Sequence, residues 1–195
     1  MSNFNSLLKP RIVNIEDVAL NTTKVTLEPL ERGFGHTLGS ALRRIMLSSI
    51  VGSSVTEVSI DGVQHEYSTI EGIQEDVIDI MLNLKNVSFK MNGNSSATLS
   101  LSKSNVGLVT AGDIELKNNI EIVNPDHVIA NITTAGSKLN MEIEVSEGIG
   151  YSSAGQRIHD TSRKVGSLLV DASYSPIKKV SYKVDSARVE QRTDL

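Results

Sequence analysis

A run of closely spaced glycines, Gly33-Phe34-Gly35-His36-Thr37-Leu38-Gly39, is the first part of the sequence whose composition suggests chemistry. It follows a predicted strand and precedes a predicted helix, where backbone amides and a helix N-terminus bind phosphate in nucleotide-binding proteins. The third glycine comes one residue later than in G-x-G-x-x-G, and no Gly-Lys-Ser/Thr follows. The run therefore favours a tight strand-to-helix turn, and an enzyme that binds a phosphate-bearing ligand here is the alternative hypothesis.

The histidines and the nucleophilic side chains give no catalytic pattern. None of the four histidines lies in an H-E-x-x-H zinc motif, and His65-Glu66-Tyr67 falls on a predicted strand, where adjacent side chains point to opposite faces. The sequence contains no cysteine, which excludes disulfides and thiolate metal sites, and no G-x-S-x-G elbow is present. We therefore expect no catalytic residue, no metal and no cofactor. The histidines are His36, His65, His127 and His159.

Three carboxylates, Glu71, Glu75 and Asp79, recur at four-residue intervals in a predicted helix from Ile70 to Lys85. Carboxylates so spaced suggest a divalent cation, but no partner loop with further ligands is evident. A solvated acidic face is the preferred interpretation, and an acidic docking surface is the second. The apolar residues of this helix form one stripe, which indicates packing against a single core: Ile73, Val77, Ile80, Met81 and Leu84.

A second predicted helix, Thr37 to Ile50, has apolar residues over about half of its circumference, more than packing against one core requires. Leu47 lies beyond this arc, and Arg44 lies on the opposite side, where it is available to anchor a partner. The helix is either buried in a large core or part of a subunit interface. Because only 4% of the residues are aromatic, a large core would be hard to fill, and both interpretations stay open.

Most of the remaining sequence predicts strands. Asp61-Gly62 is a strong hairpin signal, and consecutive hairpins indicate antiparallel sheets and an α+β fold. The predicted hairpins are Val55–Ile60 with Val63–Tyr67, Val87–Met91 with Ala97–Leu101, and Val128–Thr133 with Leu139–Val145; Lys24–Glu28 and Ile177–Val184 are further predicted strands.

Composition excludes several classes of protein. The 195 residues carry 19 Lys+Arg against 23 Asp+Glu, a net charge of −4, so the basic excess of a stand-alone nucleic-acid binder is absent. No apolar run reaches the length of a membrane span, and the N-terminus lacks the apolar core of a signal peptide. We therefore expect a cytoplasmic protein with no membrane association.

Two unusual strings, LERGFGHTLGSALRR and RVEQRTDL, resemble the N-terminal domain of the alpha subunit of bacterial RNA polymerase, and the resemblance extends over essentially the whole chain. It implies a discontinuous dimerisation subdomain (antiparallel sheet plus helices; residues 1–51 and 168–195) with an inserted, mostly β subdomain (52–167) that contacts large subunits. It further implies a non-catalytic assembly scaffold, which pairs with a second alpha chain and recruits the beta and beta-prime subunits without binding nucleic acid directly.

The resemblance also assigns site residues. Dimer contacts are expected from Phe34, Leu38, Leu42 and Ile45, and contacts with beta from Arg44 and Leu47. A loop that approaches the large subunits is expected at His65, Glu66, Tyr67 and Ser68, and Lys85 matches a position associated with beta-prime assembly.

Three departures from the family pattern shape the expectations. Family members continue beyond RVEQRTDL into another helix and a DNA-binding domain, so a truncated form with weakened dimerisation is expected. Ser153 stands where the family usually has proline, which loosens a turn, and the segment from Arg157 to Gly166 is shorter and less acidic than usual. These changes indicate a divergent alpha whose partner alpha need not be identical.

Overall fold

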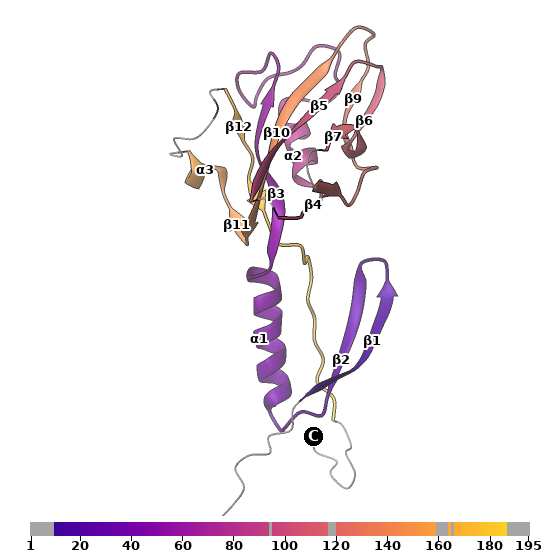
Figure 1. The fold of residues 1–195 in the computed structure, drawn as a ribbon, viewed down its shortest axis with the longest axis vertical. Coiled ribbons are helices and arrows are strands. Elements are labelled where there is room, and N and C mark those ends of the chain that lie inside the picture. Colours follow the sequence, from indigo (N-terminus) through magenta and orange to yellow (C-terminus); the bar gives the residue numbers. More distant parts are fainter. Residues whose placement is uncertain (1–9, 94, 117–119, 159–163, 165, 187–195) are drawn as a thin grey trace, which may run out of the picture. The chain divides into compact units, whose positions relative to one another are not determined.

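The structure is a computed structural model that describes residues 10–93, 95–116, 120–158, 164 and 166–186 (Figure 1). The chain divides into two compact units, one within Met1–Leu47 and Lys179–Leu195, the other within Ser48–Lys178. Antiparallel strands predominate and helices are few, as the expected α+β class requires. No helix in the described part of the chain is long and apolar enough to cross a membrane.

The smaller unit contains a hairpin, a helix and an extended segment. Strands β1 (Arg11–Ala19) and β2 (Thr22–Glu28) pair around a tight turn in which Asn21 adopts φ 58°. Gly33, at φ 83°, precedes helix α1 (Phe34–Ser48), whose final residue already belongs to the larger unit. The chain returns to the smaller unit after Lys178 as an extended segment without regular secondary structure over residues 179–186.

The larger unit contains the main sheet, whose strands are all antiparallel to their neighbours in the order β7-β5-β10-β3-β4-β8, with β12 also pairing with β3. Two small sheets, β6–β9 and β11–β13, accompany it. Its strands are β3 (Val51–Ile60), β4 (Phe89–Met91), β5 (Ser96–Lys103), β6 (Gly107–Thr110), β7 (Ile114–Glu115), β8 (Ile120–Ile122), β9 (Val128–Ile132), β10 (Leu139–Ile149), β11 (Tyr151–Ser152), β12 (Leu168–Leu169) and β13 (Ala172–Ser173), and its helices are α2 (Val77–Lys85), α3 (Ala154–Arg157) and the 3₁₀ turn η1 (Ala111–Asp113).

The two outer strands of the main sheet are too close in the sequence for the sheet to be flat. Strands β7 and β8 lie at opposite ends of the strand order, yet Glu115 and Ile120 are separated by five residue steps. Five steps span at most about 18 Å, whereas the outer strands of a flat six-stranded sheet lie about 24 Å apart. The sheet is therefore not flat, and its buried side chains form part of the core of the larger unit.

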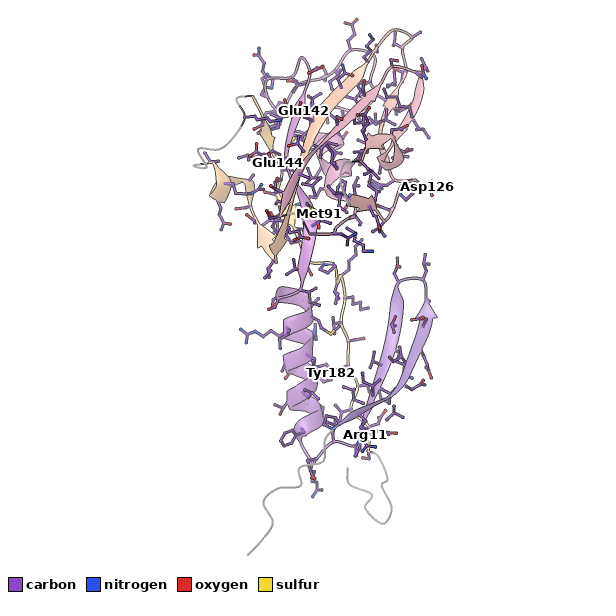
Figure 2. All side chains as sticks on the ribbon, in the orientation of Figure 1. Arg11, Met91, Asp126, Glu142, Glu144 and Tyr182 are labelled. Carbon is purple, nitrogen blue, oxygen red and sulfur yellow. The ribbon has the colours of Figure 1, made fainter. Side chains whose placement is uncertain are left out.

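Alternation along β10 shows how the sequence builds this core. Met141, Ile143 and Val145 point inward and are at most 3% exposed, whereas Glu142 and Glu144 lie on the outer face (Figure 2). Helix α2 contributes three more buried side chains from its apolar stripe, Val77, Ile80 and Leu84. Because these side chains come from segments far apart in the sequence, the core of the larger unit depends on long-range pairing.

The predicted hairpins are wrong in their pairing, although most of the strands exist. Asp61-Gly62 forms a turn in which the Val63 N–H donates to the Ile60 carbonyl, 3.1 Å away, but no strand follows, and β3 pairs with β10 instead. Strands β4 and β5 are not neighbours, nor are β9 and β10. Alternation is a local property of a strand, whereas its partner is chosen by burial over the whole sheet.

Three further segments differ from the predictions. Helix α2 begins at Val77, not Ile70, because the preceding residues form bridges (Thr69 with Asp76, Ile73 with Ile132) and Asp76 caps the helix by accepting a 2.9 Å hydrogen bond from the Asp79 N–H. Helix α1 covers Phe34–Ser48 where Thr37–Ile50 was predicted. The predicted strand Ile177–Val184 is irregular and pairs with no strand among the residues that the structure describes.

Candidate subunit-contact surfaces

One face of α1 is covered by the extended segment of the same unit. Gly35 and Gly39 share this face, four residues apart, and the side chains of Val184 and Tyr182 lie over them. Figure 2 labels Tyr182, whose side chain lies beside α1. A Cβ atom placed on Gly35 would lie 2.7 Å from a Val184 methyl carbon, and a Cβ on Gly39 would lie 2.5 Å from the Tyr182 ring. The two glycines therefore allow close packing of the return segment.

This packing corrects the interpretation of the glycine run as one strand-to-helix turn. Only Gly33 lies in the turn, with a positive φ, while Gly35 and Gly39 lie within the helix. Gly39 is beyond the first turn of α1, where helical hydrogen bonding occupies its amide. The run thus does not wrap around an anion, and nothing in this geometry favours the phosphate-binding alternative.

A second apolar face of α1 is open. Phe34, Leu38 and Ile45 lie about 100° around the helix from the glycine face, and none of them is buried. Phe34 is 52% exposed and Ile45 is 54% exposed. Leu42, between the two faces, is 38% exposed. The four expected dimer residues thus lie within an arc of about 80° on α1, on which Phe34, Leu42 and Ile45 are exposed and Leu38 is half-buried.

Arg44 and Leu47 lie on the sector of α1 that faces away from both apolar faces. Arg44 is exposed and Leu47 is half-buried. Arg43, the neighbouring arginine, is also exposed but lies about 100° further around the helix. Arg43 therefore serves as a natural control for any role of Arg44.

The hairpin of the smaller unit carries another exposed apolar surface. Ile12 pairs with Leu27 and Ile15 pairs with Val25, so these side chains share one face. Ile12 and Ile15 are each 61% exposed, and Val25 is 52% exposed. The opposite face carries the ion pair between Glu16 and Lys24, whose charged atoms are 3.7 Å apart. The hairpin thus has one apolar and one polar face, the pattern of a sheet that is covered on one side.

In the larger unit, the expected loop contacts form a compact turn at His65–Ser68, which a backbone hydrogen bond links to the start of α2. The Ser68 hydroxyl donates to the His65 carbonyl at 2.7 Å and lies 3.2 Å from His65 Nδ1. His65 and Glu66 are exposed, and Tyr67 is 77% exposed. The Ser68 carbonyl accepts from the N–H of Val77, the first residue of α2, so the helix fixes the position of the turn.

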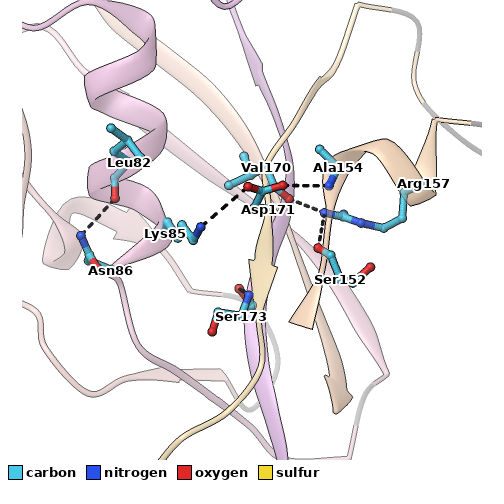
Figure 3. A network of polar contacts seen from close by, with 10 residues as sticks. Leu82, Lys85, Asn86, Ser152, Ala154, Arg157, Val170, Asp171 and Ser173 are labelled. Atoms are coloured by element: carbon cyan, nitrogen blue, oxygen red, sulfur yellow. Dashed lines mark hydrogen bonds and ion pairs between the residues drawn. The ribbon is translucent and has the colours of Figure 1, made fainter. Parts of the chain in front are cut away.

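Lys85 ends α2 and belongs to a separate polar network (Figure 3). Its Nζ atom lies 3.9 Å from Asp171 Oδ2 and 5.7 Å from the centroid of the Tyr151 ring. Asp171 also accepts a 2.9 Å hydrogen bond from the Ala154 N–H. Val77, which bonds to the Ser68 carbonyl, and Lys85 are the two end residues of α2, with a helical rise of about 12 Å between them, so we treat the turn and the Lys85 network as separate surfaces.

The electrostatics of this network follow from its hydrogen bonds. Bonds from the Ala154 N–H and the Tyr151 hydroxyl, together with the charges of Lys85 and Arg157, hold the pKa of Asp171 below its usual value. The bond to Asp171 raises the pKa of Tyr151. Asp171 is therefore ionised at neutral pH and forms an ion pair with Lys85.

Arg157 fastens the elements around this network to the sheet. Its guanidinium donates to the carbonyls of Thr56 on β3 at 3.0 Å and of Val170 beside β12, and weakly to that of Ser152 on β11 at 3.5 Å (Figure 3). Backbone carbonyls from three segments thereby converge on one side chain. Arg157 therefore has a structural role in holding α3 and β11 in place.

The three carboxylates predicted to share one helical face do not do so, because α2 begins after two of them. Only Asp79 lies in the helix, and Glu75 accepts a 2.7 Å hydrogen bond from the Asn131 N–H on β9. Among the described residues, no group of three His, Cys, Asp or Glu side chains is placed to hold a metal ion. His159 and RVEQRTDL lie outside the described residues.

The larger unit is thus a β-rich domain, in which one helix, α2, packs on an antiparallel sheet and ends in the Lys85 network. The family model of the RNA polymerase Rpb3/RpoA insert domain matches residues 58–175, from within β3 to just after β13. The chain belongs to this family, which confirms the expected likeness to the N-terminal domain of a bacterial alpha subunit. Its family role is therefore that of a subunit of DNA-directed RNA polymerase, the complex that carries out transcription.

Sequence reasoning missed several residues that organise these surfaces. Gly35 and Gly39 are spaced i, i+4, which in a helix indicates a face where another segment can pack closely. Tyr182 and Val184 are the residues that pack there. The clustering of Tyr151, Asp171 and Lys85 had no such signal, because these residues come from segments up to 86 positions apart.

Proposed function

We propose that this chain is a non-catalytic assembly scaffold of RNA polymerase, which pairs with a second alpha chain and then recruits the beta and beta-prime subunits in the cytoplasm. Residues 1–51 and 168–195, a range that includes the smaller unit, are the dimerisation part, and residues 52–167 are the insertion that contacts large subunits. The chain contributes no catalytic residue and binds no nucleic acid directly. Family membership supports the polymerase setting, and the surfaces described above support the assignment of contacts.

The observation that carries the proposal is the exposure of apolar side chains in the described part of the smaller unit. None of its described residues has a buried apolar side chain. Phe34 and Ile45 on α1 are more than half exposed, and so are Ile12, Ile15 and Val25 on the apolar face of the hairpin. Exposed apolar surface of this kind marks a protein interface. A second chain that covers this surface would supply the missing core, as in obligate dimers.

Self-association of the full chain tests the dimer. A concentration series by sedimentation is expected to show a reversible dimer, which Leu38→Glu abolishes because a carboxylate would be buried in an apolar contact, at a cost of at least about 2 kcal/mol. Ser40→Glu, on an exposed sector away from the open face, is the control and is expected to leave the dimer intact. Self-association of a single chain type identifies the partner as an identical copy; a strictly monomeric wild-type chain would contradict self-pairing.

Contacts with the large subunits are proposed at three places. Arg44 and Leu47 on α1 would bind beta, the His65–Ser68 turn would approach the large subunits, and Lys85 would contribute to beta-prime assembly. The exposure of Arg44 and of Tyr67 supports this assignment. The arginine fork is suited to bidentate recognition of a carboxylate.

Co-expression with the two large subunits tests these contacts. Arg44→Glu is expected to reduce recovery of beta by at least about tenfold, since charge reversal at an interface anchor costs about 2 kcal/mol or more. Arg43→Glu makes the same charge change on a neighbouring sector and is expected to have a much smaller effect. Equal losses in the two variants would show that net charge, not the position of Arg44, decides assembly.

A further inference from the structure

The return segment interlocks with α1 through two matched pairs. Gly35 and Gly39 are four residues apart on a helix, and Tyr182 and Val184 are two residues apart on an extended chain, so each pair lies on one side of its element. The Tyr182 ring occupies the space beside Gly39 at a distance that any larger residue would violate. The same ring meets His36 edge-on, with centroids 6.4 Å apart and an interplanar angle of 69°.

This interlock matters because it is a close-packed contact of α1 within the described part of its unit. The described part of the smaller unit has no buried apolar side chain that would prevent the helix from rolling about its axis. The glycine face and the open face are about 100° apart. A ring seated against Gly39 therefore determines where Phe34, Leu38 and Ile45 point.

We infer that Tyr182 is a positioning residue for self-association: its ring fills the notch at Gly39 and fixes the rotation of α1, so that the open face is presented to the second chain. The inference rests on the proposed dimer. Tyr182 packs against the glycine face of α1, and the expected dimer residues lie on the open face, so Tyr182 acts on the dimer through the position of α1.

The sign of the effect of Gly39→Ala separates this inference from local helix stability. Alanine is a better helix former than glycine, so helix propensity alone predicts a more stable helix and an unchanged or tighter dimer. The added methyl group would instead meet the Tyr182 ring. We expect dimerisation of the full chain, measured by sedimentation, to weaken by at least about tenfold.

Variants of Tyr182 test the same contact from the other side. Tyr182→Ala is expected to weaken the dimer to a similar extent, and Tyr182→Phe, which keeps the ring, is expected to retain wild-type affinity. In the double variant Gly39→Ala with Tyr182→Ala, the ring is already absent and the methyl group has space, so the dimer should be no weaker than in Tyr182→Ala alone, and the two losses should not add. Ser40→Ala, an exposed neighbour, is the control for substitution in α1.

The outcomes distinguish the inference from the dimer itself. If Leu38→Glu abolishes self-association but Gly39→Ala and Tyr182→Ala do not weaken it, the inference is overturned and the dimer stands. If the losses of Gly39→Ala and Tyr182→Ala add in the double variant, the two residues act independently, Tyr182 is not the group that the methyl displaces, and the inference also fails. A wild-type chain that stays monomeric overturns both.

Discussion

The two units differ in how their apolar residues are used. In the larger unit, strands from distant parts of the chain and helix α2 surround a continuous core in which side chains such as Leu99, Ile143 and Ile80 are fully buried. In the smaller unit, apolar side chains of similar size, such as Ile15 and Ile45, remain more than half exposed. Burial of such a side chain is worth about 1.5–3 kcal/mol. The larger unit therefore has its own source of stability, whereas the smaller unit has apolar surface left for a partner.

The largest expected difference uses the same residue type in both units. Phe89, on β4, is 7% exposed, and Phe89→Ala is expected to lower the free energy of unfolding by about 3–5 kcal/mol through lost burial and a cavity. Urea denaturation at low protein concentration measures this loss. A loss below about 1 kcal/mol would show that the core of the larger unit is loosely packed.

Phe34→Ala is the matched change in the smaller unit. Because Phe34 is 52% exposed, this variant is expected to change the unfolding free energy of the monomer by less than about 0.5 kcal/mol. Its dimer should nevertheless be weaker by about 1–3 kcal/mol, since an aromatic anchor would be lost from the interface. Sedimentation measures the second effect, and an unaltered dimer would remove Phe34 from the proposed contact.

A carboxylate of the larger unit gives a pH-dependent contribution to stability. Asp113 Oδ2 accepts from Lys103 at 2.6 Å and from the Thr110 N–H at 2.8 Å. Burial raises the pKa of Asp113, but these bonds outweigh it, and the pKa lies below the usual 3.8. A lowered pKa means that this stabilisation is present above pH 3.8 and is lost as the pH falls through the folded-state value.

Asp113→Asn tests this contribution. It is expected to cost about 1 kcal/mol at neutral pH, because the charge pair with Lys103 is lost while the amide oxygen can still accept from the Thr110 N–H. Denaturation at a series of pH values should show wild type and variant converging in acid. A constant difference at every pH would mean that the charge on Asp113 is not the cause.

The smallest effect is expected for the ion pair of the hairpin. Glu16 and Lys24 are both more than half exposed, and exposed pairs of this kind contribute little. Lys24→Ala should therefore change stability by less than about 0.5 kcal/mol in thermal unfolding. A larger loss would show that charge, and not apolar contact with a partner, stabilises the smaller unit.

Sequence reasoning succeeded where the signal was local. The alternation in β2, β3, β5 and β10 identified these strands, and the wide apolar arc of α1 indicated a helix with more than one partner. In the structure, one apolar face of α1 contacts Tyr182 and Val184, and a second face is open. The expected dimer residues, the contacts with large subunits and the division of the chain into functional subdomains stay predictions.

Sequence reasoning failed where a choice depended on the rest of the fold. The Asp61-Gly62 turn was correctly located, but β3 pairs with β10, some 80 residues later, because that register buries Val58 against Ile143. Helix α2 starts late because residues before Val77 bridge to β9 and to the Ser68 turn.

The amino-acid sequence by itself determined which segments extend, which faces are apolar and to which family the chain is similar, because side-chain periodicity and motif strings are properties of neighbouring residues. The tertiary structure decided which strands pair, which glycines hold a turn and which receive a packed ring, and where Lys85 meets Asp171 and Tyr151. Those outcomes depend on the free energy of contacts between distant segments, which local periodicity does not encode.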